Sequence, residues 1–105
     1  MSPTLLKAQQ TRKIAEIGEA LRAAGVRTLL EQMKALGLPR STTYTIIRAQ
    51  HKSTGITGKI ITQMLRSPQL PPSVRAAIED YAREKLSGAY GSTDKQRRRF
   101  NERLQ

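Results

Sequence analysis

The chain has 105 residues, contains no cysteine and carries a formal net charge of +11 at pH 7. This length predicts one domain with a modest core, and the absence of cysteine excludes disulfides and zinc–thiolate sites. The first residues lack the apolar run of a signal peptide, and no apolar stretch approaches the ~20 residues that span a bilayer. The surplus of cations favours nucleic acid as the partner, with an anionic membrane surface as the rival.

The N-terminal part of the chain is expected to form one amphipathic helix. Its apolar residues Ile14, Ile17, Leu21 and Ala24 recur at spacings of three and four, which is the period of one helix face. Gly25 is expected to end the helix, because glycine is common just past a helix end. Residues 1–10 are expected to be an N-terminal arm or an extension of this helix.

Two shorter helices are expected next, one on each side of a glycine. Thr28 opens the first, because Glu31 three residues later completes a capping box. Gly37 ends this helix and lets the chain turn sharply into the second, which covers residues 39–49. The side chains expected to face the core are Leu29, Leu30, Met33 and Leu36 in the first helix, and Thr43, Ile46 and Ile47 in the second.

The rest of the chain is predicted to add three more helices. Apolar residues at helical spacing indicate helices over residues 57–66 and 73–86, separated by prolines that end one and restart the other. Residues 92–105 are expected to form a short basic helix. Its apolar residues Phe100 and Leu104 either pack on the core or pair with a second subunit.

Anions and cations are unevenly distributed along the chain. Residues 32–78 contain no Asp or Glu, while Lys and Arg recur throughout this window. The window cannot form ion pairs within itself, so it must present positive potential to an approaching partner. It also encloses the predicted helix, glycine turn and helix in the segment MKALGLPRSTTYTIIRAQ. The combination indicates a helix that docks on nucleic acid.

This pattern resembles a known family of DNA-binding domains. Residues 11–87 resemble the helix-turn-helix domain of the lambda repressor, Cro and Lac repressor superfamily, and IGEALRAAGVRTLLEQMKALGLPRSTTYTIIRAQ (residues 17–50) is similar to its first three helices. The resemblance implies an all-α fold: a five-helix lambda-repressor-like helix-turn-helix domain over residues 11–91. The basic C-terminal helix of residues 92–105 is an addition to that form.

The sequence departs from the family pattern around the turn. Gln32 and Met33 stand where the family usually has an apolar and a small residue, so Gln32 is expected to be half-buried and to need a hydrogen-bond partner. Thr43 stands where Val or Ile is common, and Pro39 stands where Ser or Thr often caps the helix. The crossing of the two helices can therefore differ from the family's.

The resemblance implies that the first exposed residues of the helix over residues 39–49 contact bases, namely Arg40, Ser41, Tyr44 and Thr45. The guanidinium of Arg40 can pair with guanine O6 and N7, although a solvated cation at a helix start is the simpler interpretation. Tyr44 either contacts the DNA backbone or packs partly on the core. The residues expected to contact phosphates are Thr42, Arg48, His51, Lys52, Ser53, Arg97 and Arg98.

The leading prediction is a sequence-specific, double-stranded-DNA-binding transcriptional regulator of the repressor type. It is expected to act as a homodimer and to be a cytoplasmic, nucleoid-associated protein of a prokaryote or a phage. The alternatives are an accessory architectural DNA-binding protein for excision or partition of a mobile element, and a protein–protein regulator (antiactivator) of another transcription factor. RNA is a weaker candidate, because aromatic side chains for base stacking are few.

No enzymatic activity is expected. No carboxylate pairs with the single histidine, His51, at a catalytic spacing, and a phosphate-binding loop is missing from the sequence. His51 also lacks the cysteine or second histidine that would make it a convincing metal ligand. No cofactor, metal, small-molecule ligand or membrane partner is expected.

Overall fold

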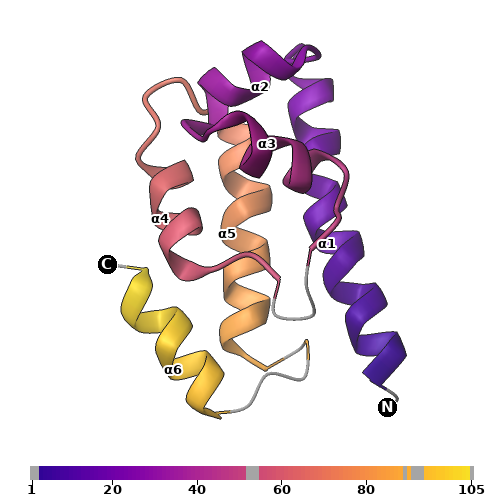
Figure 1. Cartoon of the computed structure of the whole chain (residues 1–105), viewed down its shortest axis with the longest axis vertical. Helices are drawn as coiled ribbons and strands as arrows, with labels where there is room; N and C mark the ends of the chain where they lie inside the picture. The colour runs from indigo at the N-terminus through magenta and orange to yellow at the C-terminus, as the bar shows by residue number, and fades with distance from the viewer. Residues whose placement is uncertain (1–2, 52–54, 89, 91–93, 105) are drawn as a thin grey trace.

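The structure is a computed structural model that describes residues 3–51, 55–88, 90 and 94–104. All the regular structure in these residues is helical, as predicted (Figure 1). The six helices are α1 (Pro3–Ala23), α2 (Leu29–Leu36), α3 (Arg40–Ile47), α4 (Gly58–Leu65), α5 (Pro72–Leu86) and α6 (Asp94–Arg103). No helix among the described residues is long and apolar enough to cross a bilayer.

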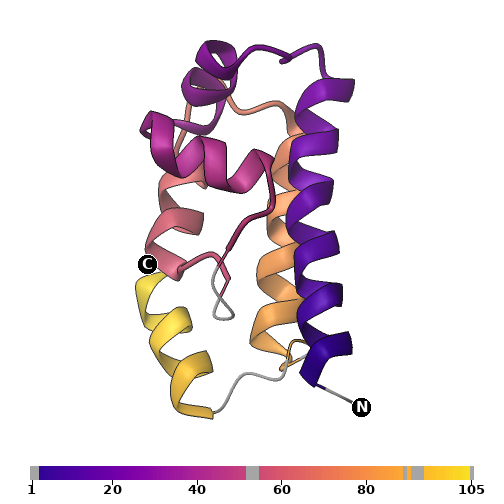
Figure 2. The same ribbon diagram turned by 45° about the vertical axis from the view of Figure 1, so that its right-hand side comes forward.

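The long helices α1 and α5 pack along each other and form the frame of the molecule (Figures 1 and 2). Residues 3–10 extend α1, which settles the choice between arm and extension for these residues. Ile14, Ile17 and Leu21 are buried as predicted. Ala24 is exposed instead, because α1 ends just before it and Gly25 turns the chain away with a φ of 85°.

The short helices α2, α3 and α4 lie on one side of this frame, together with α6 (Figure 2). The capping box of α2 is present: the Glu31 amide donates to Thr28 Oγ1 at 3.2 Å, and the Thr28 amide donates to Glu31 Oε1 at 3.3 Å. The predicted inward face of α2 was partly wrong. Leu36 is buried as predicted, but Leu30 is 60% exposed, because the helix turns Gln32 and Ala35 toward the core beside Leu36.

Helix α6 packs on α4 and α5. Phe100 is buried in the same core as α1 and α5, and Leu104 is partly buried against it. Gly58 permits this approach, because a Cβ at that position would overlap the Phe100 carbonyl. The hydroxyl of Thr62 donates to the Arg103 carbonyl at 3.0 Å. Of the two predicted roles for the apolar residues of this helix, packing on the chain's own core is therefore the one observed.

A buried polar cluster joins α1, α5 and the segment before α4. The Tyr81 hydroxyl donates to Gln10 Oε1 at 3.0 Å and accepts a hydrogen bond from the Ile56 amide at 2.9 Å. The Lys85 ammonium donates to the Ile56 carbonyl at 3.1 Å. Burial lowers the pKa of Lys85 to about 8 and raises the pKa of Tyr81. These bonds fix the start of α4 against the α1–α5 frame.

Candidate nucleic-acid interface

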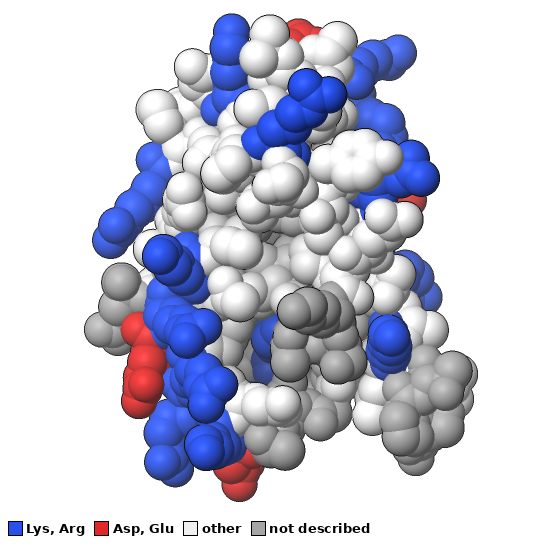
Figure 3. Space-filling model, in the orientation of Figure 1, with Lys and Arg blue, Asp and Glu red and all other residues white. Residues whose placement is uncertain are grey.

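Most of the charged side chains on the face of the molecule seen in Figure 3 are Lys or Arg, and acidic side chains are few. Most of the acids lie on the frame helices instead: Glu16 and Glu19 on α1, and Glu79, Asp80 and Glu84 on α5. There they hold a cation. Lys13 Nζ lies 2.8 Å from Asp80, 3.4 Å from Glu84 and 3.6 Å from Glu16, and its hydrogen bond to Asp80 is the main cause of its raised pKa.

The turn between α2 and α3 is built on Gly37. This glycine adopts the left-handed conformation (φ 68°, ψ 34°), which residues with a Cβ rarely take. Its amide donates to the Met33 carbonyl at 2.8 Å, closing the last turn of α2. Leu38 is then buried, and Pro39 precedes the first turn of α3. Two short helices thus meet across a three-residue turn, at the position predicted from the sequence.

Ser67, which lies just past the end of α4, supports this turn from behind. The Ser67 hydroxyl, just past α4, donates to the Ala35 carbonyl at 2.7 Å. A Cβ at Gly37 would lie only 3.3 Å from the Ser67 Cβ, so the two chain segments are in close contact. Gln32 is 4% exposed, more deeply buried than expected, and its amide donates to the Val26 carbonyl at 3.4 Å. The required partner of Gln32 is therefore a main-chain carbonyl.

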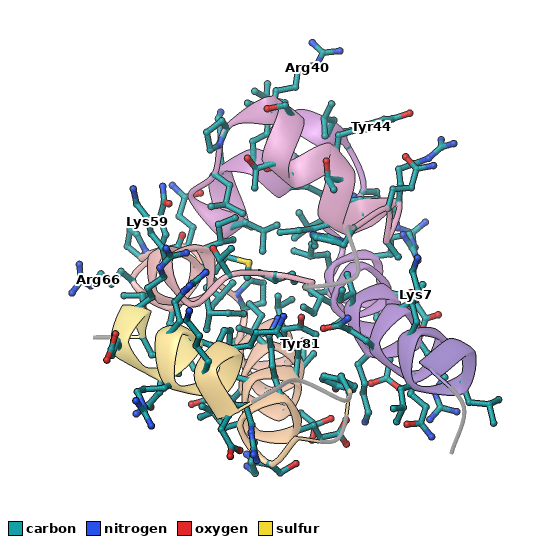
Figure 4. All side chains as sticks on the ribbon, turned by 60° about the horizontal axis from the view of Figure 1, so that its bottom comes forward. Lys7, Arg40, Tyr44, Lys59, Arg66 and Tyr81 are labelled. Carbon is teal, nitrogen blue, oxygen red and sulfur yellow. The ribbon has the colours of Figure 1, made fainter. Side chains whose placement is uncertain are left out.

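Helix α3 separates its inward and outward residues clearly. Thr43 and Ile46 are fully buried, and the Thr43 hydroxyl donates to the Leu38 carbonyl at 3.4 Å. Arg40 and Tyr44 project away from the molecule (Figure 4). The four residues predicted to contact bases form what we call the outer face of α3: Arg40, Ser41 and Tyr44 are exposed and Thr45 is half-buried.

The outer face of α3 is a shallow, open depression. Its lining consists of Pro39 and the four residues of the outer face. Arg40 has no ion-pair partner among the described residues. The Thr45 hydroxyl donates to the Ser41 carbonyl at 2.9 Å, so it can only accept a further hydrogen bond while its methyl stays available for an apolar contact.

Two of the predicted phosphate contacts lie next to the outer face of α3. Arg48 is exposed, and its guanidinium carbon lies 5.3 Å from the centroid of the Tyr44 ring. This is cation–π geometry. The contact was not predicted from the sequence, although residues four apart on a helix are neighbours. Thr42 is half-buried at the side of the same helix. Arg48 therefore combines free charge with a defined orientation.

His51 is poorly suited to contact a phosphate. The ring is partly buried, and its Nδ1 atom is enclosed without a hydrogen-bond partner among the described residues. Burial lowers the pKa of His51, and the nearby charge of Lys85 lowers it further. The ring is therefore neutral near pH 7 and offers no charge to a phosphate. Lys52 and Ser53, the next two predicted contacts, lie outside the described residues.

The two predicted contacts on α6 differ from each other. Arg97 is paired with Asp94, its Nε atom is buried, and its guanidinium packs over Gly88, so it is not free to reach a phosphate. Arg98 is exposed. Nothing in the sequence indicates this difference, because Gly88 meets Arg97 only through the packing of α5 against α6.

Two cations on α4 extend the positive surface beyond α3. Lys59 and Arg66 are exposed and point outward from α4 on the same side of the helix (Figure 4). Their spacing of seven residues places them on one helix face, opposite the buried Ile61 and Met64, and this periodicity was the signal that identifies them.

Comparison of the chain with protein-family models, with curated proteins and with solved structures finds no match. The case for a function therefore rests on the surface itself. Among the described residues, no group of three or more His, Cys, Asp or Glu side chains is placed to hold a metal ion.

Proposed function

We propose that this chain binds double-stranded DNA at specific sites as a repressor-type transcriptional regulator. In this proposal α2, the Gly37 turn and α3 act as a helix-turn-helix, and α3 enters the major groove. The observation that carries the proposal is the outer face of α3: four side chains able to contact base edges share one open surface, on a helix whose other side is anchored in the core.

The chemistry of this face fits the major groove. Arg40 supplies a planar pair of donors for guanine, and the hydroxyl of Ser41 can donate to or accept from a base edge. Arg48, held near the Tyr44 ring, is placed to meet a phosphate at the side of the groove. An α-helix fits the width of the B-DNA major groove, and Arg40 and Tyr44 point from α3 away from the rest of the molecule (Figure 4).

A homodimer is part of the proposal. One module of this size contacts only a few base pairs, and helix-turn-helix proteins gain specificity by placing two modules on a two-fold symmetric site. Half-sites one helical turn apart, about 10 base pairs, are the expected arrangement.

The experiment that tests the proposal is selection of bound duplexes from a pool of random sequences, with molar mass measured on the same complex. We expect one enriched, two-fold symmetric motif and a mass corresponding to two chains per duplex. The affinity should also fall with salt at a log–log slope of roughly −5 or steeper per dimer, because phosphate contacts release counterions. Failure to enrich any motif would exclude sequence-specific binding, and a salt slope near zero would exclude phosphate-driven binding.

A further inference from the structure

We propose that α6 is a second DNA-contacting element, which binds the phosphate backbone beside the groove that α3 enters. This inference rests on the proposed function and adds a surface to it. The residues that carry it are Lys95, Arg99 and Arg103, which we call the α6 row. The two phosphate contacts predicted on this helix from the sequence were Arg97 and Arg98.

The α6 row is a regular line of free cations. Its residues are spaced by four along α6, so they follow one edge of the helix over about 12 Å. All three are exposed. Among the described residues, no acid lies within ion-pair distance of any of them. The row therefore presents charge that the protein itself does not neutralise.

The α6 row continues onto α4. Arg103 lies against Gly58, where a Cβ would stand 2.9 Å from the Arg103 Cβ, and Lys59 follows directly. Lys59 and Arg66 add two exposed cations to the three of the row. Figure 3 shows Lys and Arg side chains gathered at the lower left, over α4 and α6. The acids of α6 alter this little: Asp94 is paired with Arg97, and Glu102 is a single charge beside the row.

The α6 row and the outer face of α3 can meet one duplex. Helices α3, α4 and α6 lie on the same side of the α1–α5 frame (Figure 2). The longest dimension of the molecule is 36 Å, close to the ~34 Å rise of one duplex turn. With α3 in the major groove, the α6 row falls within about one turn of it, where a phosphate backbone passes.

The packing of α6 favours a fixed contact over a loose basic tail. Phe100 is 4% exposed in the core, and the Lys85 ammonium lies 5.0 Å from the centroid of its ring. The α6 row therefore keeps a fixed position relative to α3. Held charges lose less conformational freedom when they contact phosphates than charges on a mobile segment do.

The test compares two matched double variants of the full chain. Lys95→Gln with Arg99→Gln removes one Lys and one Arg from the α6 row. Lys7→Gln with Arg12→Gln removes one Lys and one Arg from the exposed surface of α1, in the frame behind α3. Both variants have the same net charge, so a general loss of positive charge affects them equally.

We expect the α6-row variant to bind every duplex about tenfold more weakly, with a salt slope less steep by about 1.8, since each lost phosphate contact accounts for about 0.9. The preferred motif should not change. Hydroxyl-radical footprinting should lose the protection at the edge of the site and retain its centre. The α1 variant should behave as the wild type in all three measurements.

The experiment distinguishes failure of this inference from failure of the proposed function. If the wild type binds duplex and the two variants weaken it equally, the α6 row has no specific contact and this inference is wrong, while the proposed function stands. If the wild type binds no duplex, the proposed function itself is wrong. Binding to phosphatidylcholine–phosphatidylserine vesicles that is lost only in the α6-row variant, with duplex binding unchanged, would assign the row to a membrane surface and overturn the inference.

Discussion

The two sides of this molecule use their charges differently. On the frame of α1 and α5, Lys13 is surrounded by three carboxylates, and the buried Lys85 is enclosed by main-chain and aromatic groups. On the side formed by α3, α4 and α6, cations such as Arg40 and Arg99 are exposed and have no ion-pair partner among the described residues. The frame pairs Lys13 and buries Lys85, whereas Arg40 and Arg99 on the other side stay available for a partner.

Tyr81 on the frame and Tyr44 on the opposite side should differ most in their contribution to stability. Tyr81→Phe should lower the free energy of unfolding by about 2–3 kcal/mol, because the buried Ile56 amide loses its acceptor and Gln10 loses a donor. Tyr44→Phe, which removes an exposed hydroxyl, should change it by less than about 0.5 kcal/mol. Urea denaturation measures both. Equal losses would mean that Tyr81 does not fix the frame as described.

Arginine substitutions test the contrast in function. Arg40→Ala should reduce discrimination between the preferred duplex and random duplex by about 1–3 kcal/mol, the value of a bidentate guanine contact. Arg12→Ala, on the frame, should leave discrimination unchanged. Competition binding at fixed salt measures both. If Arg40→Ala weakens preferred and random duplex by the same factor, Arg40 contacts only phosphate.

The buried lysine of the frame predicts a pH effect on stability. The folded protein holds Lys85 with a pKa of about 8, below its ordinary value near 10.5, so above pH 8 the unfolded chain binds more protons than the folded one. The free energy of unfolding should therefore rise by about 1–2 kcal/mol from about pH 8 to about pH 9.5.

The measurement for this effect is urea denaturation over that pH range, below the region where tyrosines ionise. Tyr81 and Tyr90 have raised pKa values, which would lower stability above about pH 10 and mask the rise. Lys85→Met should abolish the rise. A wild type whose stability is flat from pH 8 to 9.5 would show that Lys85 is solvated in the folded state.

The smallest expected change is in the free energy of unfolding when one of two surface lysines is replaced. Lys13→Met should lower the free energy of unfolding by less than about 1 kcal/mol, because its three carboxylate contacts are partly solvated. Lys59→Met should leave stability unchanged or raise it slightly, since it removes like-charge repulsion near the α6 row. Thermal unfolding of the two variants in low salt measures both. A larger loss for Lys59→Met would reveal an ion pair on the cationic side.

Local chemistry explains what the sequence predicted well. Thr28 and Glu31 satisfy each other's hydrogen bonds within four residues, and Gly37 supplies its own left-handed turn, so both ends of α2 were predictable. Thr43 and Ile46 were also placed correctly, because their spacing requires one side of α3 to face the core. The function proposed from these features remains a prediction.

Long-range packing explains the rest. The face that α2 turns toward the core depends on its packing against α4 and on the hydrogen bond from Gln32 to the Val26 carbonyl. Neither contact can be read from the spacing of apolar residues, so Leu30 was assigned to the wrong face. The pKa of His51 is lowered by burial and by the charge of Lys85, which the fold brings near it from α5. Arg97 is constrained by Gly88 in the same way. Such contacts join distant segments and leave no periodic signal.

The residues that hold α3 in place are different from the residues on its outer face. The contacts that seat α3 come from its inward residues Thr43 and Ile46 and from Ser67 beyond α4. The exposed side chains of Arg40, Ser41 and Tyr44 take no part in that seating. Substitutions at these three positions are therefore expected to change the chemistry of the exposed surface while the fold stays intact.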